Sequence, residues 1–299
     1  MKKTISLLSV LILLSTSCLR LDSNMFNGDT TISEYKFDGF AKGELTDLYN
    51  NPTYAIADSM VHLMTLTSND NGNSATIYAE FIGNIKTINT DTIILFCHGN
   101  KWHMDNYWNR TKLFANVGGK NRFGVMTFDY RGYGKSSGAS TENSMYADGD
   151  ACLKWLESKG LTSNRLIIYG YSLGSATATE LSANPRTLTP YKLCLESPFS
   201  STQAMTSDGG GISLPASYVT NVKIDNIGKI KKVNQPFLWL HGINDDFLKI
   251  ETHGQAVFNN YHGVKGLAVK VPGAVHNNVP MVIGYTNYSN TLLDFITSK

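Results

Sequence analysis

Short apolar runs alternate with longer amphipathic stretches from about residue 91 to the end of the chain. Each run is bounded by Gly, Asn or Pro, which is typical of strands buried on both faces of a parallel sheet. The runs are IILFC (93–97), GVMTF (124–128), LIIYG (166–170), KLCLE (192–196), FLWLH (237–241) and LAVKV (267–271).

The stretches between these runs have the spacing of helices that cross over from one strand to the next. Alternating strands and helices predict an α/β fold with right-handed crossovers, a mostly parallel central sheet and helices on both faces. The expected helices cover Tyr107–Val117, Ser144–Lys159, Leu173–Ala183, Ile250–Tyr261 and Asn278–Thr297.

The earlier part of the chain has a different pattern. Residues 31–40, 59–68 and 75–82 are rich in β-branched and aromatic side chains, and the sequence Asn-Asp-Asn-Gly-Asn interrupts them at 69–73. This pattern predicts an antiparallel hairpin ahead of the parallel strands. We find no internal repeat or linker within the alternating part, so residues 34–299 are expected to form one α/β domain.

Composition agrees with one large globular domain, because 42% of the 299 residues are hydrophobic and 17% are charged. Without Lys2 and Lys3, which lie in a segment expected to be removed, the chain has 24 basic and 24 acidic residues. This balance gives no reason to expect a nucleic-acid partner.

The first 17 residues have the pattern of a secretory signal peptide, with two lysines, an apolar stretch and the small residues Ser15-Thr16-Ser17 before Cys18. The apolar stretch is shorter than the ~20 residues that cross a membrane. Small residues before a cysteine resemble the lipobox of bacterial lipoproteins, which implies a lipid on Cys18, a tether at 18–33 and attachment to the cell envelope. An ordinary cleaved signal followed by an incidental thiol is the alternative.

Three further cysteines, Cys97, Cys152 and Cys194, cannot all pair with one another because their number is odd. We expect them to be buried free thiols that act as small hydrophobic residues. The sequence has no metal-binding spacing such as C-x-x-C, and we predict no metal site.

The strongest chemical signal follows the run LIIYG. Gly170-Tyr171-Ser172-Leu173-Gly174 is a G-x-S-x-G sequence, placed between a predicted strand and a predicted helix of small residues. A sharp strand-to-helix turn pushes such a serine out of the sheet, and the flanking glycines leave room for its strained backbone. Ser172 is therefore the candidate nucleophile, and a plain tight turn is the structural alternative.

A serine hydroxyl needs a base, and the base needs a third group that orients it. In this type of fold they follow in the order Ser, acid, His. His276 follows the last apolar run and is the candidate base. Asp245 and Asp246 follow the run before it, and spacing alone barely separates them; Glu196 is a third, weaker candidate for the acid.

Two backbone N–H groups are expected to stabilise the oxyanion of such a reaction. One belongs to Leu173, directly after the serine. The second is expected on the loop after the run at 93–97, where Gly99 lets the backbone approach the substrate and Asn100 is the candidate donor. A purely structural turn at this loop is the alternative.

Six ordered motifs together resemble the α/β-hydrolase superfamily over residues ~75–299. Within it they are most similar to small-capped serine hydrolases of the α/β-hydrolase domain-containing 13 and 17 and Bem46 types, described as lysophospholipase-like or depalmitoylating. The resemblance implies the same triad, Ser172, Asp245 and His276, and favours Asn100 and Leu173 as oxyanion donors. The motifs are HGN (98–100), DYRGYGKSSG (129–138), GYSLGS (170–175), ESPF (196–199), HGINDD (241–246) and PGAVHN (272–277).

The chain departs from the pattern of that family near the predicted oxyanion loop. Lys101 stands where a small residue is usual, and an aromatic loop with Trp102, Tyr107 and Trp108 is expected to overhang the site. In the motif at 129–138, the resemblance gives Asp129 and Arg131 a structural role in bracing turns.

These observations predict a serine hydrolase that cleaves a carboxylic or thio ester through an acyl-enzyme and needs no cofactor. A serine peptidase, or a catalytically silent binding protein of the cell envelope on the same fold, is the alternative. The segment between ESPF and FLWLH has room for two short helices, near 200–206 and 225–231. Such a small cap favours short and medium acyl esters.

Overall fold

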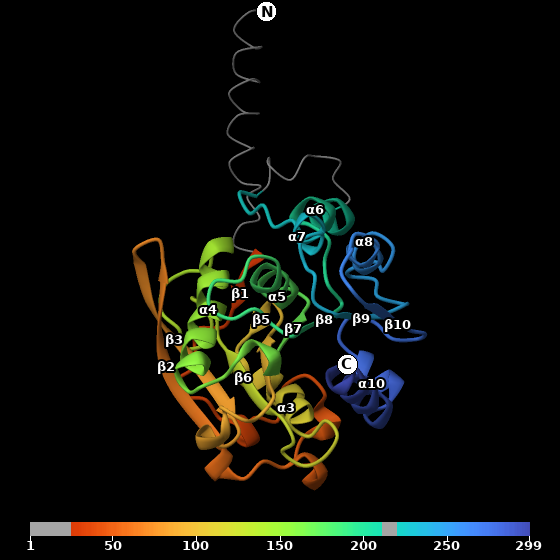
Figure 1. Ribbon diagram of the computed structural model, residues 1–299. Helices are drawn as coiled ribbons and strands as arrows, with labels where there is room; N and C mark the ends of the chain where they lie inside the picture. The colour runs from red at the N-terminus through yellow and green to blue at the C-terminus, as the bar shows by residue number, and fades with distance from the viewer. Residues whose placement is uncertain (1–24, 211–219) are drawn as a thin grey trace, which may run out of the picture.

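The computed structural model of the protein describes residues 25–210 and 220–299 (Figure 1). The predicted signal peptide and the lipid attachment at Cys18 lie outside the described residues. Within the described part of the chain, no helix is both long enough and apolar enough to cross a membrane.

The centre of the molecule is an eight-stranded sheet in the order β10-β9-β8-β7-β4-β6-β3-β2. The strands from β10 to β6 run parallel, and β3 pairs antiparallel with β6 and with β2. This confirms the mostly parallel sheet with an N-terminal hairpin. The strands are β2 Val61–Asp70, β3 Asn73–Ile82, β4 Ile93–Cys97, β6 Gly124–Phe128, β7 Leu166–Tyr171, β8 Lys192–Glu196, β9 Phe237–Gly242 and β10 Gly266–Val271.

All six apolar runs form strands, but one of them is not buried on both faces. Strands β4, β6, β7, β8 and β9 are buried throughout, whereas most of β10 is exposed or half-buried. The expectation of two covered faces is wrong for β10 because it is the edge strand of the sheet and pairs only with β9.

Helices cover both faces of the sheet (Figure 1). Residues of α4, α5, α7 and α8 share one apolar cluster with the sheet, and residues of α3, α9 and α10 share the other. The expected last helix is divided at Gly284, whose φ of 85° ends one helix before the next begins. The helices are α3 Met104–Ala115, α4 Glu142–Ser158, α5 Gly174–Ala183, α6 Thr202–Gly210, α7 Asn226–Ile230, α8 Gly254–Asn259, α9 Val279–Ile283 and α10 Tyr285–Thr297.

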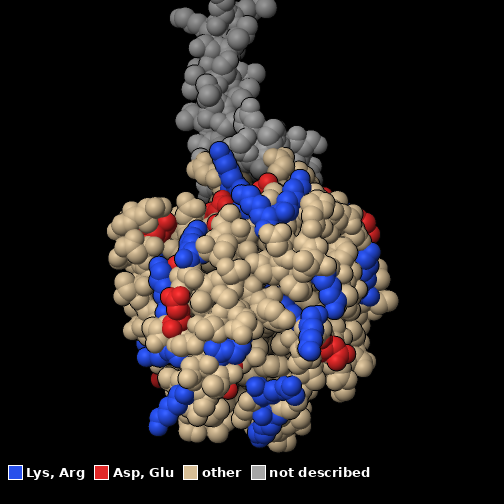
Figure 2. Space-filling view, in the orientation of Figure 1, with Lys and Arg blue, Asp and Glu red and all other residues tan. Residues whose placement is uncertain are grey.

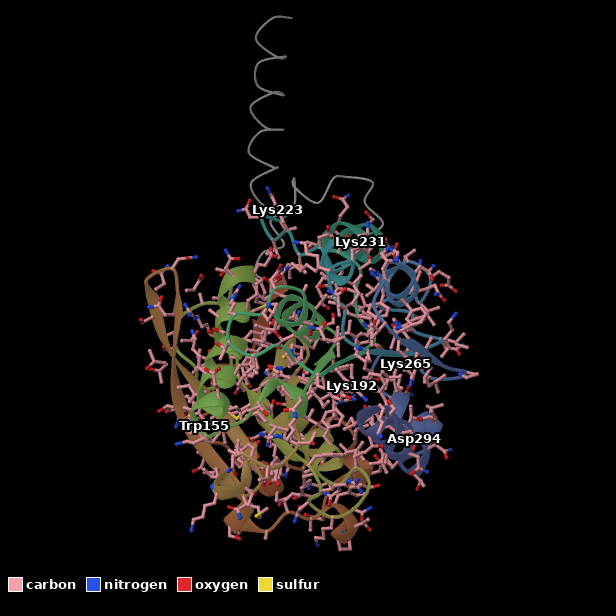
Figure 3. The ribbon with its side chains drawn as sticks, viewed as in Figure 1. Trp155, Lys192, Lys223, Lys231, Lys265 and Asp294 are labelled. Carbon is pink, nitrogen blue, oxygen red and sulfur yellow. The ribbon has the colours of Figure 1, made fainter. Side chains whose placement is uncertain are left out.

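Helix α10 is fastened to the sheet by a buried lysine. Lys192 of β8 is inaccessible to solvent, and its ammonium donates to the carbonyl oxygens of Phe295 and Ile296 at 2.6 and 3.2 Å. These carbonyls lie at the C-terminal end of the helix, where they lack partners within the helix and attract a positive charge. Figure 3 shows Lys192 between the central strands and the helix that carries Asp294.

Helix α3 differs from the amphipathic helix that the sequence predicts, because all twelve of its residues are buried. Its polar side is covered by the N-terminal segment. The side-chain amides of Asn106 and Asn109 donate to the backbone oxygens of Lys42 and Glu44 at 3.3 and 3.1 Å. The amide N–H groups of these two residues therefore bond to another part of the chain rather than to water.

The strand expected at 31–40 is wrong. A 3₁₀ turn forms at Phe37–Gly39. The Phe37 ring packs against the Trp108 ring, with centroids 5.1 Å apart. The Asp105 carboxylate accepts the backbone N–H groups of Lys36 and Phe37 at 2.8–3.0 Å. Because these donors bond to a side chain, they do not join a sheet.

Part of the expected tether lies against the domain. Strand β1 (Asn27–Gly28) pairs parallel with strand β5 (Lys101–Trp102), directly after the HGN motif. The backbone N–H of Asn27 also donates to the Asn100 side-chain oxygen at 2.9 Å. Residues before position 34 thus contact a loop of the candidate site.

Other sequence expectations are confirmed. Cys97, Cys152 and Cys194 are buried free thiols, and burial raises the pKa of each. The segment before β9 holds two short helices in its described part, α6 and α7. On the face drawn in Figure 2, basic and acidic side chains are dispersed over the surface.

Candidate active site

Ser172 stands on the sharp turn between β7 and α5, with a φ of 51° that non-glycine residues rarely adopt. Its backbone N–H donates to the Glu196 oxygen at 3.0 Å, which ties the turn to the neighbouring strand. A Cβ atom at Gly174 would overlap the Cys97 carbonyl, and one at Gly170 would overlap Ala178. Both glycines of the motif are therefore required by close packing around the strained serine.

Loops after β9 and β10 bring an acid and a histidine to this serine. His276 Nε2 lies 2.9 Å from Ser172 Oγ, and His276 Nδ1 lies 2.8 Å from Asp245 Oδ2. A carboxylate only accepts, so the imidazole proton sits on Nδ1 and leaves Nε2 to accept from the serine hydroxyl. This tautomer is the one that a base for Ser172 needs.

Asp245 and its neighbour Asp246 point in different directions. Asp245 is 4% exposed, and its Oδ1 accepts the backbone N–H groups of Phe247 and Leu248 at 3.0 and 2.8 Å. Asp246 is exposed and lines the pocket in front of the serine. The geometry separates the two aspartates that sequence spacing could not.

The electrostatics around Asp245 favour its ionised form. Burial raises the pKa of this carboxyl, but hydrogen bonds from His241 and His276, and the positive charge that His276 can carry, outweigh burial and hold the pKa well below its usual range. Asp245 is therefore a carboxylate at any pH at which the protein would work.

His241 is a residue of the site whose role sequence reasoning missed. The Trp239 indole N–H donates to His241 Nδ1 at 3.2 Å, so the imidazole proton sits on Nε2. Nε2 lies 3.1 Å from Asp245 Oδ2 and 2.9 Å from the Leu248 oxygen. His241 thus bonds to local backbone and also to the carboxylate that faces His276.

Aromatic rings flank the imidazole of His276. The Phe247 ring meets it edge-on with centroids 5.0 Å apart, and the Tyr171 ring lies 5.6 Å away. The backbone oxygen of His276 accepts from the Ser197 hydroxyl at 3.2 Å. The histidine is held from both its ring and its backbone, and 17% of its side chain stays exposed to the pocket.

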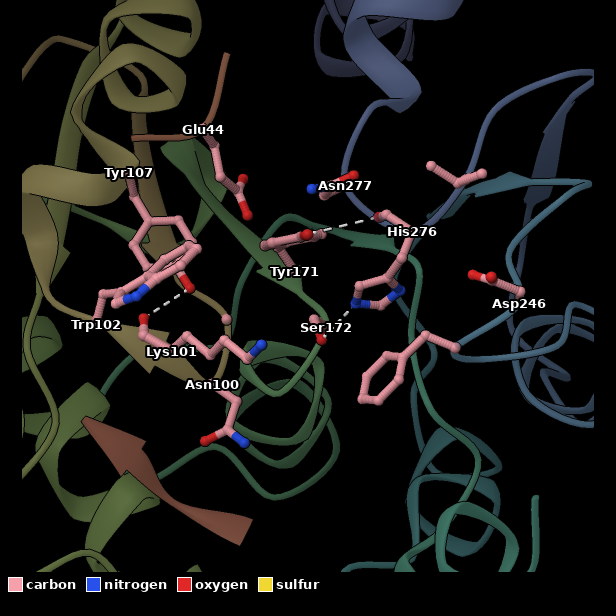
Figure 4. A pocket seen from close by; sticks show the side chains of 13 residues that line it. Glu44, Asn100, Lys101, Trp102, Tyr107, Tyr171, Ser172, Asp246, His276 and Asn277 are labelled. Atoms are coloured by element: carbon pink, nitrogen blue, oxygen red, sulfur yellow. Dashed lines mark hydrogen bonds between the residues drawn. The ribbon is translucent and has the colours of Figure 1, made fainter. Parts of the chain in front are cut away.

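The two predicted oxyanion donors lie on the expected loops. Leu173 directly follows the serine and precedes the first turn of α5. Asn100 lines the pocket, but its side-chain oxygen accepts from the Tyr133 hydroxyl at 2.8 Å and from the Asn27 N–H. Figure 4 shows this side chain turned away from Ser172, so the backbone of Asn100 is the part that can serve as a donor.

A pocket of about 290 Å³ opens in front of Ser172 and His276 (Figure 4). Its apolar walls come from Trp102, Tyr107, Tyr171, Phe247 and Val275, and its polar groups include Glu44, Lys101 and Asp246. Of the predicted aromatic loop, Trp102 and Tyr107 line this pocket. Trp108 does not overhang it, because α3 buries that ring and Asp38 binds its N–H at 2.7 Å.

A chain of buried ions lies beneath the pocket. The Arg110 guanidinium is inaccessible to solvent and bonds to Glu44 Oε2 at 2.9 Å and to Glu196 Oε1 at 2.8 Å. It also stacks over the Tyr171 ring at 4.3 Å. Because Tyr171 precedes Ser172, this network supports the turn that carries the serine.

Sequence reasoning did not find Glu44 or Arg110. Burial raises the pKa of the Glu44 carboxyl, and the charge of Arg110 partly offsets that effect. Glu196, weighed only as an alternative acid, accepts from Arg110 through Oε1 and from the Tyr288 hydroxyl at 2.7 Å through Oε2, so both of its oxygens belong to this network. The available signal was Arg110 on the expected helix now seen as α3. The sequence alone indicated an amphipathic helix with one exposed side, because it does not show that the N-terminal segment covers that side.

Asp129 and Arg131 brace turns, as the sequence comparison implies. Arg131 Nε donates to Asp148 at 2.9 Å, and Asp129 accepts from the Tyr35 hydroxyl at 2.6 Å. Across the described residues, no group of three or more His, Cys, Asp or Glu side chains is placed to hold a metal ion.

Known proteins resemble this chain in sequence and in fold. A family model described as "Serine aminopeptidase, S33" matches residues 88–223. Alpha/beta hydrolase domain-containing protein 17B of Homo sapiens is 30% identical over 215 residues, which cover 71% of this chain and 68% of that protein; the Xenopus tropicalis protein of the same name gives the same figures.

The fold is also that of solved hydrolases. The Pyrococcus furiosus esterase Pf2001 superposes with a TM-score of 0.64 at 16% identity, covering 91% of this chain and 97% of the esterase. At this identity the likeness concerns the fold, whereas the relatives above share sequence over two thirds of their length. The chain therefore belongs to the α/β-hydrolase family, in the group of the alpha/beta hydrolase domain-containing 17 proteins.

Proposed function

We propose that the protein is a serine hydrolase that cleaves a carboxylic or thio ester. The observation that carries the proposal is the continuous hydrogen-bonded chain from Asp245 through His276 to Ser172, which ends in a pocket. A nucleophile, a base and an orienting acid in this order are the parts that acyl transfer requires.

In the first step, His276 Nε2 takes the Ser172 proton while Oγ attacks the substrate carbonyl. The imidazolium then gives that proton to the leaving alcohol or thiol, and an acyl-serine remains. Asp245 stays ionised and stabilises the imidazolium, which agrees with its lowered pKa. In the second step, water gives a proton to His276 and its oxygen attacks the acyl group. The imidazolium then returns this proton to Ser172 Oγ as the carboxylic acid leaves, which restores the enzyme.

The oxyanion formed in each step needs donors. We assign them to the backbone N–H groups of Leu173 and Asn100. Leu173 precedes the first turn of α5, whose N-terminal end favours negative charge. Loss of one such donor typically costs ~3 kcal/mol of transition-state stabilisation.

We infer that short and medium acyl groups fit best. The pocket volume of about 290 Å³ lies at the lower end of the roughly 300–1,000 Å³ seen for ligand sites. In its described part the cap contributes only the short helices α6 and α7. Both features disfavour a long acyl chain.

Ser172→Ala is the direct test. It should abolish labelling by a fluorophosphonate probe and lower kcat/KM on p-nitrophenyl esters by at least about a thousandfold. Ser182→Ala is the matched control, because Ser182 is a buried serine on α5 whose hydroxyl donates to the backbone oxygen of Ala178 in the same helix. Residual turnover within tenfold of the wild-type value would refute the nucleophile, and a steady rise in rate from two to sixteen carbons would refute the small acyl site.

A peptidase is the second candidate, favoured by the description of the matching family model. An amide needs stronger protonation of its leaving group than an ester, and His276 is the acid available for both. Aminoacyl p-nitroanilides, measured beside p-nitrophenyl esters of the same acyl group, separate the two activities. A catalytically silent binding protein would neither react with the probe nor turn over any substrate.

We propose that the protein is exported and anchored in the bacterial cell envelope by a lipid on Cys18. The support is the sequence before this cysteine. Two acyl chains on one N-terminus give stable attachment where one does not. Cys18→Ser should therefore move the protein out of the membrane fraction or block its processing, and a wild-type protein that is wholly in the soluble fraction with an unmodified Cys18 would contradict the anchor.

A further inference from the structure

Lys101 is a basic side chain in the pocket to which the mechanism above gives no role. It follows Asn100 directly and lines the pocket together with Ser172 and His276. Figure 4 shows its side chain extending along the pocket with the ammonium group toward Ser172. A basic side chain therefore lines the same pocket as the candidate nucleophile.

The backbone of Lys101 is held on both sides. Its carbonyl oxygen accepts from the Tyr107 hydroxyl at 2.9 Å, and the residue pairs with Asn27 in the two-stranded sheet of β1 and β5. The next residue, Trp102, has a φ of 68°, a strained value that persists only where surrounding contacts impose it. These contacts fix the direction in which the lysine side chain leaves the backbone.

The carboxylates of the pocket do not neutralise this ammonium. Glu44 is paired with Arg110 through two N–H bonds to one oxygen. Asp246 lies on the far side of His276 from Lys101 in Figure 4. Lys101 forms no ion pair within the part of the chain that the structure describes, so its charge is available to a ligand.

We propose that Lys101 is a specificity-determining residue that selects esters carrying an anionic group, a carboxylate or a phosphate, a few bonds from the scissile carbonyl. The proposal rests on the proposed hydrolase function and adds the charge of the substrate. Lys101 is exposed, so water partly screens its charge and the attraction to an anion is that of a partly screened ion pair. A neutral ester of the same shape gains nothing from this charge.

Two pairs of substrates place the anion on either side of the ester. The mono-p-nitrophenyl ester of glutaric acid, compared with its methyl-capped form, carries the charge on the acyl group. Acetylated glycerol 3-phosphate, compared with acetylated glycerol, carries it on the alcohol. The pair with the larger anionic-to-neutral ratio of kcat/KM identifies the side that Lys101 reaches.

Lys101→Met should lower that ratio about fivefold, the size expected for one partly screened ion pair. Lys101→Arg should keep most of the ratio, and Lys101→Glu should invert it. Lys86→Met is the matched control. Lys86 is an exposed lysine that precedes β4, so it lies at the amino ends of the parallel strands, whereas the pocket lies at their carboxyl ends. In 1 M salt, where the Debye length is ~3 Å, the wild-type ratio should approach that of Lys101→Met.

Three outcomes overturn the proposal. A ratio that Lys101→Met leaves unchanged removes the lysine from substrate selection. An equal loss on anionic and neutral esters would assign Lys101 to oxyanion stabilisation or pocket structure instead. If wild-type protein neither reacts with the fluorophosphonate probe nor cleaves any ester, the proposed function is wrong and this inference is wrong with it. If the protein reacts normally with the probe but shows no preference for anionic esters, only this inference is wrong.

Discussion

Two buried carboxylates, Asp245 at the active-site edge and Glu80 inside the sheet, have opposite surroundings. Asp245 faces four N–H donors, two from histidines and two from the backbone, and its pKa is lowered. Glu80 is inaccessible to solvent, and neither of its carboxyl oxygens has a hydrogen-bond partner within the described residues. Burial, and then the nearby charges of Asp105 and Asp38, raise its pKa well above the usual value.

Burial raises the pKa of both carboxyls, and the difference between them shows that hydrogen-bond donors decide whether this effect is overcome. The donors of Asp245 come from the turn that follows β9, from His241 at the end of β9 and from His276 on the loop after β10. Glu80 lies on β3, where the backbone N–H groups are used in pairing with β2 and β6. A loop can direct its backbone at a carboxylate, whereas a strand inside a sheet cannot.

The largest effect we expect is a loss of activity on substitution of Asp245, the carboxylate with four N–H donors. Asp245→Asn should lower kcat by about 10⁴-fold, because an amide no longer holds the Nδ1 proton of His276 in place. The neighbouring Asp246→Asn is the matched control and should change kcat/KM by less than about tenfold, since that side chain is exposed. Steady-state kinetics on a short p-nitrophenyl ester decide between them, and the reverse ranking would show that Asp246 is the acid.

Glu196 is a third buried carboxylate, and its charge partner is a single buried arginine, Arg110. Arg110→Met should lower the free energy of unfolding by about 3–5 kcal/mol, since Glu44 and Glu196 would lose their shared cation. Thermal and urea denaturation measure this loss. Arg122→Met, at an exposed arginine, is the control.

Adding Glu44→Gln to Arg110→Met sharpens the test of the ion network. It removes one unpaired carboxylate, so the double variant should be more stable than Arg110→Met alone. A loss below about 1 kcal/mol for the single variant would mean that water replaces the guanidinium, and the network would then not be a structural support of the Tyr171 turn.

Much of the fold could be predicted because its strands are short apolar runs with clear ends. The runs at 93–97, 124–128 and 192–196 match β4, β6 and β8 without any shift in their bounds. The order of motifs along the chain likewise led to Ser172, His276 and the pair Asp245 and Asp246, since a fixed topology brings the carboxyl ends of these strands together. The family resemblance then favoured Asp245.

The rest depended on contacts between segments far apart in the sequence. Glu44 and Arg110 are 66 positions apart, and no local pattern connects them. The segment at 31–40 has the composition of a strand, but its N–H groups bond to Asp105 on a helix whose position a single sequence does not reveal. Periodicity predicts which elements form, and it does not show which segment covers them.

The smallest effect we expect is a change in the pH dependence of stability, and it concerns Glu80, the carboxyl without hydrogen-bond donors among the described residues. The ordinary pKa of a glutamate, 4.5, applies to the unfolded chain, while the folded value is raised well above it. Below pH 4.5 both states are protonated, and Glu80 adds no pH dependence. As the pH rises above 4.5, the unfolded chain releases this proton and the folded protein keeps it, so stability falls with rising pH until the folded carboxyl also ionises.

Glu80→Gln removes this ionisation while it keeps the shape of a protonated carboxyl. We expect Tm to rise by about 2–4 °C at pH 7.5, the shift that ~1 kcal/mol produces in a protein of this size, with little or no rise at pH 4. Glu157→Gln, at an exposed glutamate of α4, should show no such pH-dependent gain. Thermal denaturation across this range is the measurement. A variant that is less stable at pH 7.5 would mean that Glu80 is ionised and paired in the folded protein, and the contrast with Asp245 would then fail.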